Sequence, residues 1–301
     1  MKTTAFDIVK DQDLSGKVFL ITGGYAGLGA VTVQALLLAK ATVIVTGRSK
    51  SAQEEFGKSL VENPELNFDK KQLDVSHTLD LGYLASVRDF VNYILKAYKQ
   101  IDCLVNNAGV MNTPAGMTKD GFEIQMGINV IGHFLLSKML VGITKRQVWL
   151  SSKGHIRYGA PGIDYDAITA VDDATYIPRS RYQQAKLGNI LLARQFARQY
   201  PHLTAYSVHP GGVKTDLGRY MSIGQKVKFV LQNPFIVMSM VEPEVGAATQ
   251  VMLAIKPEEE LTNGAYYSDC KVTKTAPSGE DMEDAKKLFE FCEEATKAFQ
   301  K

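Results

Sequence analysis

A phenol and an ammonium group stand four residues apart at Tyr182 and Lys186, within the sequence YQQAK. Residues at this spacing share one face of a helix, so the two groups would lie close together. A free phenol has a pKa near ~10, and lowering that value by about 3 units requires roughly 4 kcal/mol. One positive charge at about 5 Å, with an effective dielectric constant of ~20, supplies about 3 kcal/mol. Lys186 with one further positive charge would therefore let Tyr182 exchange a proton, although this spacing is common by chance.

A glycine-rich segment, TGGYAGLG, stands between an apolar run and a helical pattern. Glycines allow a sharp turn and a close approach to a pyrophosphate, whose charge the helix N-terminus then meets. The spacing Gly-x-x-x-Gly-x-Gly differs from the common GxGxxG, and a turn without a ligand is the alternative. The residues predicted to form this dinucleotide site are Thr22, Gly23, Tyr25, Ala26, Gly27, Leu28 and Gly29.

Arg48 follows the second apolar run directly, next to Gly47. In folds that select NAD, an acid near this point bonds the ribose 2′-hydroxyl, and no acid is present here. A guanidinium can instead bond a 2′-phosphate through two charge-assisted hydrogen bonds. We therefore expect NADP(H), the alternative being a solvated surface arginine.

Short apolar runs alternate with helical patterns six times along the chain. The expected strands are 17–21, 42–45, a short run ending at 73–75, 102–105, 147–150 and 204–208. The main helical patterns are 28–40, 79–98, 124–140, 182–199 and 279–301. This alternation predicts an α/β fold: a single doubly wound Rossmann domain over 1–301, with a parallel sheet of six to seven strands and helices on both faces.

Ligands bind at the carboxyl ends of the strands in such sheets. Asp74 and Val75 end the third expected strand, and the sequence NNAG, which contains Asn107, Ala108 and Gly109, ends the fourth. These residues are candidates for the same site, although NNAG alone could be a tight loop.

Composition narrows the class of protein. The 301 residues are 45% hydrophobic and carry a formal net charge of +2, which gives no reason to expect nucleic acid as a partner. Three cysteines without a CxxC pair and five scattered histidines predict no metal site. No signal peptide and no run of 18 apolar residues is found, so we expect a cytoplasmic protein without a transmembrane span.

From about residue 17 to about residue 215, the chain resembles the short-chain dehydrogenase/reductase family. It is most similar to the branch that holds retinol-dehydrogenase-like and WW-domain-containing oxidoreductases and small fungal reductases. The motifs that carry the likeness occur in the family's order: TGGYAGLG, Asp74-Val75, NNAG, Asn129 before VIGHF, Ser151-Ser152, YQQAK and PGGVKT at 210–215.

The resemblance implies a catalytic set of Asn129, Ser152, Tyr182 and Lys186. Tyr182 would be the general acid in reduction and the base in oxidation, and Lys186 would bond the nicotinamide ribose. Ser152 would hydrogen-bond the substrate oxygen, and Asn129 would break the regularity of its helix and hold a water molecule. Each could instead be structural, for example a strand-end hydroxyl or a helix asparagine.

Further coenzyme contacts are implied by the same likeness. Asp74 would bond the adenine, Asn107 would shape the site, and Val213 and Thr215 would hold the carboxamide, although Thr215 could be a helix N-cap. The remaining implied contacts are Val75, Ala108, Gly109, Pro210 and Gly211.

Ser152 and Tyr182 are separated by an insertion, about 154–181, which with 216–240 is expected to form a substrate loop and lid. Apolar side chains there suit a sizeable apolar carbonyl or alcohol, although many could be packing residues. The main ones are Tyr158, Tyr165, Tyr176, Ile177, Met221, Ile223, Phe229, Phe235 and Met238. Arginines that could instead meet a carboxylate are Arg157, Arg179, Arg181 and Arg219. The insertion could cover a dimerisation face, so monomer and homodimer both stay open.

The expected function is NADP(H)-dependent oxidoreduction of such a substrate, with carbonyl reduction favoured. An NAD-dependent alcohol, steroid or retinoid dehydrogenase is the first alternative. A non-catalytic NADPH sensor or scaffold is the second, and such proteins usually lose the tyrosine or the lysine, both of which are present here. Lipid association through 226–240 is a third, weakened by Asn233-Pro234 within that run.

Overall fold

The computed structural model describes residues 2–157, 162–213 and 240–300. Its sheet has eight strands in the order β3-β2-β1-β4-β5-β6-β7-β8. All neighbouring pairs are parallel except β7 and β8. The strands are β1 (Val18–Thr22), β2 (Thr42–Thr46), β3 (Leu73–Asp74), β4 (Cys103–Asn106), β5 (Arg146–Leu150), β6 (Thr204–His209), β7 (Tyr266–Ser268) and β8 (Lys271–Val272). The predicted doubly wound α/β fold is confirmed, but the expected six to seven parallel strands are corrected to eight, because β7 and the antiparallel β8 lie beyond the six strands that the sequence pattern located.

Helices fill most of the intervals between the strands. The described α-helices are α1 (Ala5–Val9), α2 (Gly27–Leu38), α3 (Lys50–Glu62), α4 (Leu84–Ala97), α5 (Ile124–Met126), α6 (Gly132–Met139), α7 (Gly154–Arg157), α8 (Asp166–Thr169), α9 (Pro178–Gln199), α12 (Pro243–Gly246), α13 (Ala248–Ile255) and α14 (Met282–Thr296). A π-helical segment, Gly127–Ile131, joins α5 to α6. Helix α9 begins one turn before the expected start because Pro178 occupies its first turn, where a missing N–H costs nothing.

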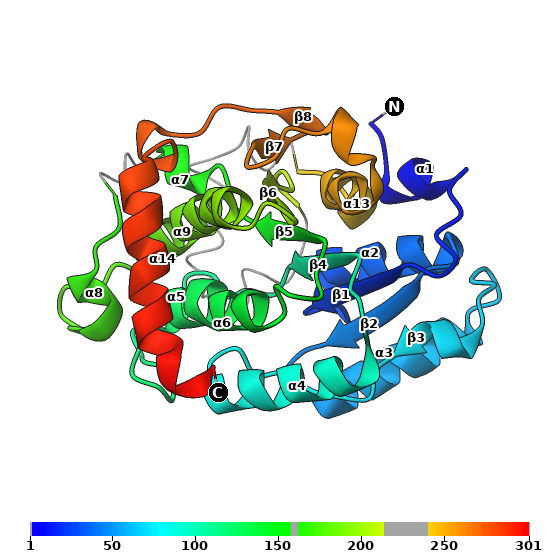
Figure 1. Ribbon diagram of the computed structural model, residues 1–301, viewed down its shortest axis with the longest axis horizontal. Helices are drawn as coiled ribbons and strands as arrows, with labels where there is room; N and C mark the ends of the chain where they lie inside the picture. Colours follow the sequence, from blue (N-terminus) through cyan, green and yellow to red (C-terminus); the bar gives the residue numbers. More distant parts are fainter. Residues whose placement is uncertain (1, 158–161, 214–239, 301) are drawn as a thin grey trace.

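The sheet is covered on both faces (Figure 1). Alternate residues of the central strand β5 enter opposite cores: Val148 packs with α2 and α13, and Trp149 packs with α4, α6 and α9. Helix α14 packs on the outside of the helices that surround Trp149, where it contacts α9 and α6. All five residues of β5 are buried, as expected for a parallel strand covered on both sides.

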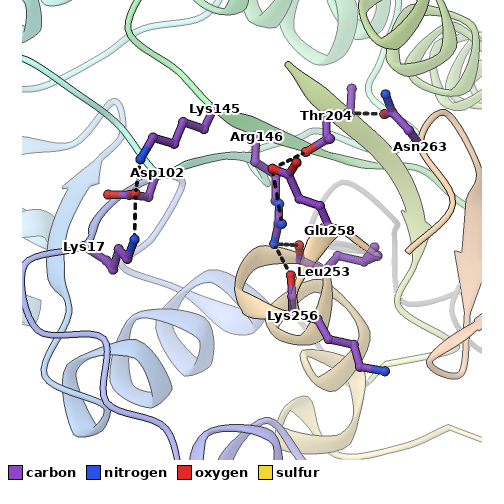
Figure 2. Close-up of polar contacts among 10 residues, drawn as sticks. Lys17, Asp102, Lys145, Arg146, Thr204, Leu253, Lys256, Glu258 and Asn263 are labelled. Carbon is purple, nitrogen blue, oxygen red and sulfur yellow. Dashed lines mark hydrogen bonds and ion pairs between the residues drawn. The ribbon is translucent and has the colours of Figure 1, made fainter. Parts of the chain in front are cut away.

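Charged residues tie the amino ends of the strands together (Figure 2). Asp102, just before β4, pairs with Lys17 at 3.6 Å and with Lys145 at 3.2 Å. The buried Arg146 at the start of β5 donates to the carbonyl oxygens of Leu253 (3.0 Å) and Lys256 (2.8 Å). It thereby caps the C-terminal end of α13. These pairs stabilise the edge of the sheet opposite the carboxyl ends of the strands.

The strand order reverses between β1 and β4, which are direct neighbours in the sheet. A reversal of this kind opens a crevice at the carboxyl ends of the two strands, because the connections leave toward opposite faces. The segments that follow β1 and β4 are the glycine-rich turn and NNAG. The fold therefore brings together two motifs that are more than eighty residues apart in sequence.

Candidate active site

The glycine-rich turn is held by the end of β4. Thr22 Oγ1 accepts hydrogen bonds from the backbone N–H groups of Asn107 and Ala108, each at 2.9 Å. The Asn107 side chain donates to the carbonyl oxygen of Thr22 at 2.8 Å. Thr22 and Asn107 therefore shape this turn through hydrogen bonds within the protein.

The geometry of the turn fits a dinucleotide phosphate. A Cβ at Gly29 would lie 2.3 Å from the carbonyl oxygen of Gly23 and 2.9 Å from the Cα of Gly24, so only glycine allows this approach of α2 to the turn. Ala26, the N-cap of α2, has no side-chain oxygen to bind the first N–H groups of the helix. Those N–H groups are suited to an anion.

The end of β2 carries the predicted coenzyme-selecting residue. Arg48 is exposed and directly follows the buried Gly47. The ring of Tyr25 lies over Gly47, where a Cβ would come within 2.3 Å of the tyrosine Cε1. The Tyr25 hydroxyl accepts a long hydrogen bond from the Ser49 backbone at 3.4 Å. Arg48 and Tyr25, which belong to different motifs, thus lie on the same side of the crevice.

Asp74 faces α4 and already has partners for both carboxylate oxygens. One oxygen accepts from the hydroxyls of Tyr93 (2.5 Å) and Tyr98 (2.8 Å), and the other from the Ser76 hydroxyl at 2.6 Å. Burial by itself would raise the Asp74 pKa, but these hydrogen bonds hold it below its ordinary value. Val75 packs its side chain against Gly57 of α3. A contact between Asp74 and adenine therefore stays a prediction, and in this arrangement the carboxylate is committed elsewhere.

A second acid, Asp80, lies nearer to the end of β2. The backbone N–H of Leu79 donates to the carbonyl oxygen of Gly47 at 3.0 Å, so the chain returns to the sheet edge at this point. Asp80 is half-buried there, and its carboxylate accepts from the Gly82 backbone at 2.9 Å. Sequence reasoning missed this residue, although the pair Asp80-Leu81 before a helical pattern resembles Asp74-Val75.

Asn129 lies in the π-helical segment and is fully buried. Its side chain accepts from the backbone N–H of Val110 at 2.9 Å and donates to the carbonyl oxygen of the same residue at 3.0 Å. A Cβ on Gly109 would lie 2.9 Å from Asn129 Oδ1 and 3.6 Å from Lys186 Nζ. NNAG, Asn129 and Lys186 therefore converge on one place, and glycine at position 109 leaves room for them.

The two serines after β5 have different environments. Ser151 is buried, and its hydroxyl donates to the carbonyl oxygen of Lys186 at 2.6 Å. Ser152 is half-buried, accepts from the Gly154 backbone at 3.1 Å, and lies close enough to Tyr182 to lower the pKa of its phenol. The hydroxyl beside the tyrosine is thus the one implied by the family resemblance.

Tyr182 and Lys186 share one face of α9. Lys186 Nζ lies 5.6 Å from the centre of the Tyr182 ring and donates to the carbonyl oxygen of Leu150 at 2.9 Å. Burial lowers the Lys186 pKa to about 8. Burial also raises the Tyr182 pKa above its ordinary value, an effect that the Ser152 hydrogen bond opposes. The expected lowering of the Tyr182 pKa by Lys186 is not found in the protein alone. Burial raises the pKa of the phenol, and the Lys186 ammonium donates to the Leu150 carbonyl oxygen.

Two histidines to which the sequence analysis gave no role form hydrogen bonds with the backbone of Ser152 and Lys153, just after β5. His155 hydrogen-bonds the carbonyl oxygen of Ser152, and its other ring nitrogen accepts from the Ala276 backbone at 3.3 Å. His209, at the end of β6, accepts from the Lys153 backbone at 3.2 Å. Their positions, three residues after Ser152 and one before PGGVKT, were the available signal.

Polar side chains of the insertion form hydrogen bonds and ion pairs within the protein. The Tyr176 hydroxyl donates to the buried Glu123 at 2.7 Å, and the Tyr165 hydroxyl donates to Asp284 of α14 at 2.7 Å. Arg181 pairs with Asp164 at 3.1 Å. Both tyrosine hydroxyls therefore anchor the insertion, and the expectation that their rings wall the substrate pocket stays a prediction. Ile177 is 62% exposed.

The segment after β6 is described only in part. Pro210 and Gly211 follow β6, and Val213 forms a parallel bridge with Val241. Residues predicted for this site or its lid that lie outside the described part of the chain are Tyr158, Thr215, Arg219, Met221, Ile223, Phe229, Phe235 and Met238. Of Arg157 only the backbone is described.

A dinucleotide-type crevice with adjacent serine and tyrosine hydroxyls and a lysine ammonium is the site of a coenzyme-dependent oxidoreductase. The family model described as short chain dehydrogenase matches residues 17–156. Retinol dehydrogenase 14 from Homo sapiens is 36% identical over 93% of this chain and 86% of its own length. The chloroplastic short-chain dehydrogenase TIC 32 A from Brassica napus is 33% identical over 96% of this chain and 91% of its own. The chain belongs to the short-chain dehydrogenase/reductase family.

Solved structures agree with this assignment. An uncharacterized protein from Mycobacterium paratuberculosis matches with a TM-score of 0.75 and 26% identity, over 99% of this chain and 98% of its own. A Pseudomonas aeruginosa RhlG/NADP complex matches with a TM-score of 0.65 and 20% identity, over 89% and 98% of the two chains, and shows the fold alone. No helix in the described ranges is both long and apolar enough to cross a bilayer, and no cluster of metal-binding side chains occurs in them.

Proposed function

We propose that this protein transfers a hydride between NADP(H) and a sizeable apolar carbonyl or alcohol, with reduction favoured and Tyr182 as the general acid. The observation that carries the proposal is the grouping of Ser152, Tyr182 and Lys186 beside Gly109 and Asn129. Two neighbouring hydroxyls can both turn to a single substrate oxygen, and a positioned acid contributes about 10²–10⁴ in rate.

The protein's own groups divide the work. When bound, the reduced nicotinamide supplies the hydride. Ser152 would stabilise the negative charge that develops on the substrate oxygen, and Tyr182 would give that oxygen its proton. The raised Tyr182 pKa keeps the phenol protonated at neutral pH, which is the form that reduction requires. Lys186, whose Nζ now bonds the Leu150 carbonyl, would bond a ribose hydroxyl and return a proton to the phenol.

Coenzyme and substrate class rest on separate support. Arg48 is exposed beside Gly47 and favours a 2′-phosphate. The retinol dehydrogenases among the relatives carry the name of a large apolar alcohol, which supports a substrate of that class. The same names favour a second candidate function, oxidation of such an alcohol by the same residues acting in reverse.

A panel of aldehydes, ketones and alcohols, followed photometrically with NADPH and NADH in parallel, tests this function. We expect carbonyl-dependent consumption of NADPH. Arg48→Ala should weaken NADPH far more than NADH, and Lys50→Ala, which removes an exposed charge two residues away, should change neither. Equal losses for both coenzymes in Arg48→Ala would refute the 2′-phosphate contact, and coenzyme binding without turnover would favour a sensor.

A further inference from the structure

His133 connects the two halves of the site. The ring is fully buried between the end of β1 and the π-helical segment. Its Nε2 lies 2.9 Å from Thr22 Oγ1, and its Nδ1 lies 3.1 Å from the backbone carbonyl oxygen of Asn129. A single imidazole thus touches both the glycine-rich turn and the segment that carries Asn129.

The hydrogen bonds around Thr22 determine which ring nitrogen carries the proton. A hydroxyl oxygen has two lone pairs and one proton. The N–H groups of Asn107 and Ala108 occupy both lone pairs, so the proton must go to an acceptor. His133 Nε2 at 2.9 Å is closer than the Val105 carbonyl at 3.4 Å. The Thr22 hydroxyl therefore donates to Nε2, and Nδ1 carries the ring proton and donates to Asn129.

This tautomer is stable over a wide pH range. Burial lowers the His133 pKa to about 3, against a smaller opposing effect of the Asn129 carbonyl. The charged groups of neighbouring elements include Lys186, which lowers that pKa further. Trp149 of β5 presents its ring to the histidine at 6.4 Å and adds no charge. The imidazole therefore stays neutral, with one donor and one acceptor.

We propose that His133 is a positioning residue for the oxidoreductase site, on whose proposed function this assignment rests. Its Nδ1–H holds the Asn129 carbonyl in the π-helical segment, and its Nε2 ties that segment to Thr22. Asn129 in turn holds both backbone groups of Val110, next to Gly109 and the Lys186 ammonium. A π-helical segment departs from the regular α-helical bonding pattern, and the His133 ring gives its Asn129 carbonyl a side-chain partner.

Three substitutions separate hydrogen bonding from packing. In His133→Asn, the side-chain amide keeps a hydrogen-bond donor near the position of Nδ1. In His133→Gln, the longer side chain places its amide near the position of Nε2 instead. His133→Phe keeps an aromatic ring but has no hydrogen-bonding atom. We expect kcat to fall about 10- to 100-fold in the Gln and Phe variants, the scale of a misplaced site, and to stay within about threefold in the Asn variant. The dissociation constant for NADPH should change by less than about threefold in all three, because the Thr22 bonds to NNAG remain.

A second readout does not depend on turnover. The Val110 amide is bonded by Asn129, so its hydrogen exchange should be faster in His133→Phe than in His133→Asn. Equal kcat losses in all three variants, wild-type kcat in His133→Phe, or equal exchange at Val110 would each overturn the positioning role. If the wild-type protein shows no turnover, the proposed function is wrong. The comparison of hydrogen exchange at the Val110 amide in the two variants would still decide the role of His133.

Discussion

Ser151 and Ser152 are chemically identical neighbours with opposite tasks. The Ser151 hydroxyl donates to the Lys186 carbonyl, whereas the Ser152 hydroxyl lies beside the Tyr182 phenol and lowers its pKa. Ser152→Ala should lower kcat with little change in stability. Ser151→Ala should cost about 1 kcal/mol of unfolding free energy, the usual worth of one hydrogen bond, and leave kcat nearly unchanged.

Steady-state kinetics and urea unfolding of both serine variants separate the two roles. Each variant is the control for the other, because the same atom is removed one residue apart. If Ser151→Ala loses as much turnover as Ser152→Ala, the distinction between a substrate-facing and a packing serine is wrong.

Tyr182 is the residue on which the chemistry depends. Tyr182→Phe should lower turnover by about 10²–10⁴, the contribution of a positioned acid or base. Coenzyme binding should be unchanged, since the ring and its packing are kept. Single-turnover kinetics with NADPH, together with a fluorescence titration of coenzyme binding, checks both parts. Turnover equal to that of the wild type would remove the mechanism.

At the scale of elements, the contact of α2 with the glycine-rich turn sets the coenzyme site. In Gly29→Ala the new Cβ would lie 2.3 Å from the Gly23 carbonyl and 2.9 Å from the Gly24 Cα, both backbone atoms that must then move. We expect NADPH affinity to fall at least about tenfold, because each 1.4 kcal/mol of lost binding energy is a factor of ten. Isothermal titration calorimetry measures this loss.

Gly142→Ala is the matched control, since a Cβ there meets no atom within 4 Å. Its affinity for NADPH should equal that of the wild type. An unchanged affinity in Gly29→Ala would mean that the turn adapts, and that its close packing is not what binds the pyrophosphate.

The whole molecule should become less stable in mild acid, because it buries neutral histidines. Burial lowers the His133 pKa to about 3 and the His209 pKa to about 4, whereas an unfolded chain has a value near ~6.5. Between about pH 6.5 and about pH 4 the unfolded state binds protons that the folded state does not. The unfolding free energy must therefore fall as the pH falls through this window.

Urea unfolding at a series of pH values from about 7 to about 4 measures this slope. His209→Asn should show a smaller fall than the wild type, since one titrating group has been removed. An unfolding free energy that stays constant over this range would contradict the lowered pKa of both imidazoles in the folded protein.

Local sequence determined the order of elements and the place of each motif. Short, mainly apolar runs and the helical patterns between them located six of the strands, from β1 (Val18–Thr22) to β6 (Thr204–His209), because burial on both faces of a parallel sheet favours continuous apolar runs. The short β7 and β8 carried no such signal. The family membership was also predictable, since it depends on motif order along the chain.

Only the tertiary structure decided what the individual polar groups do. Hydrogen-bond partners come from residues distant in sequence, such as Tyr93 and Tyr98 for Asp74, or Thr22 for His133. The return of the chain at Leu79, which brings Asp80 to the sheet edge, likewise depends on a contact with Gly47. Local sequence specifies which side chains are available, whereas the packing of strands and helices determines which of them meet and which lose water.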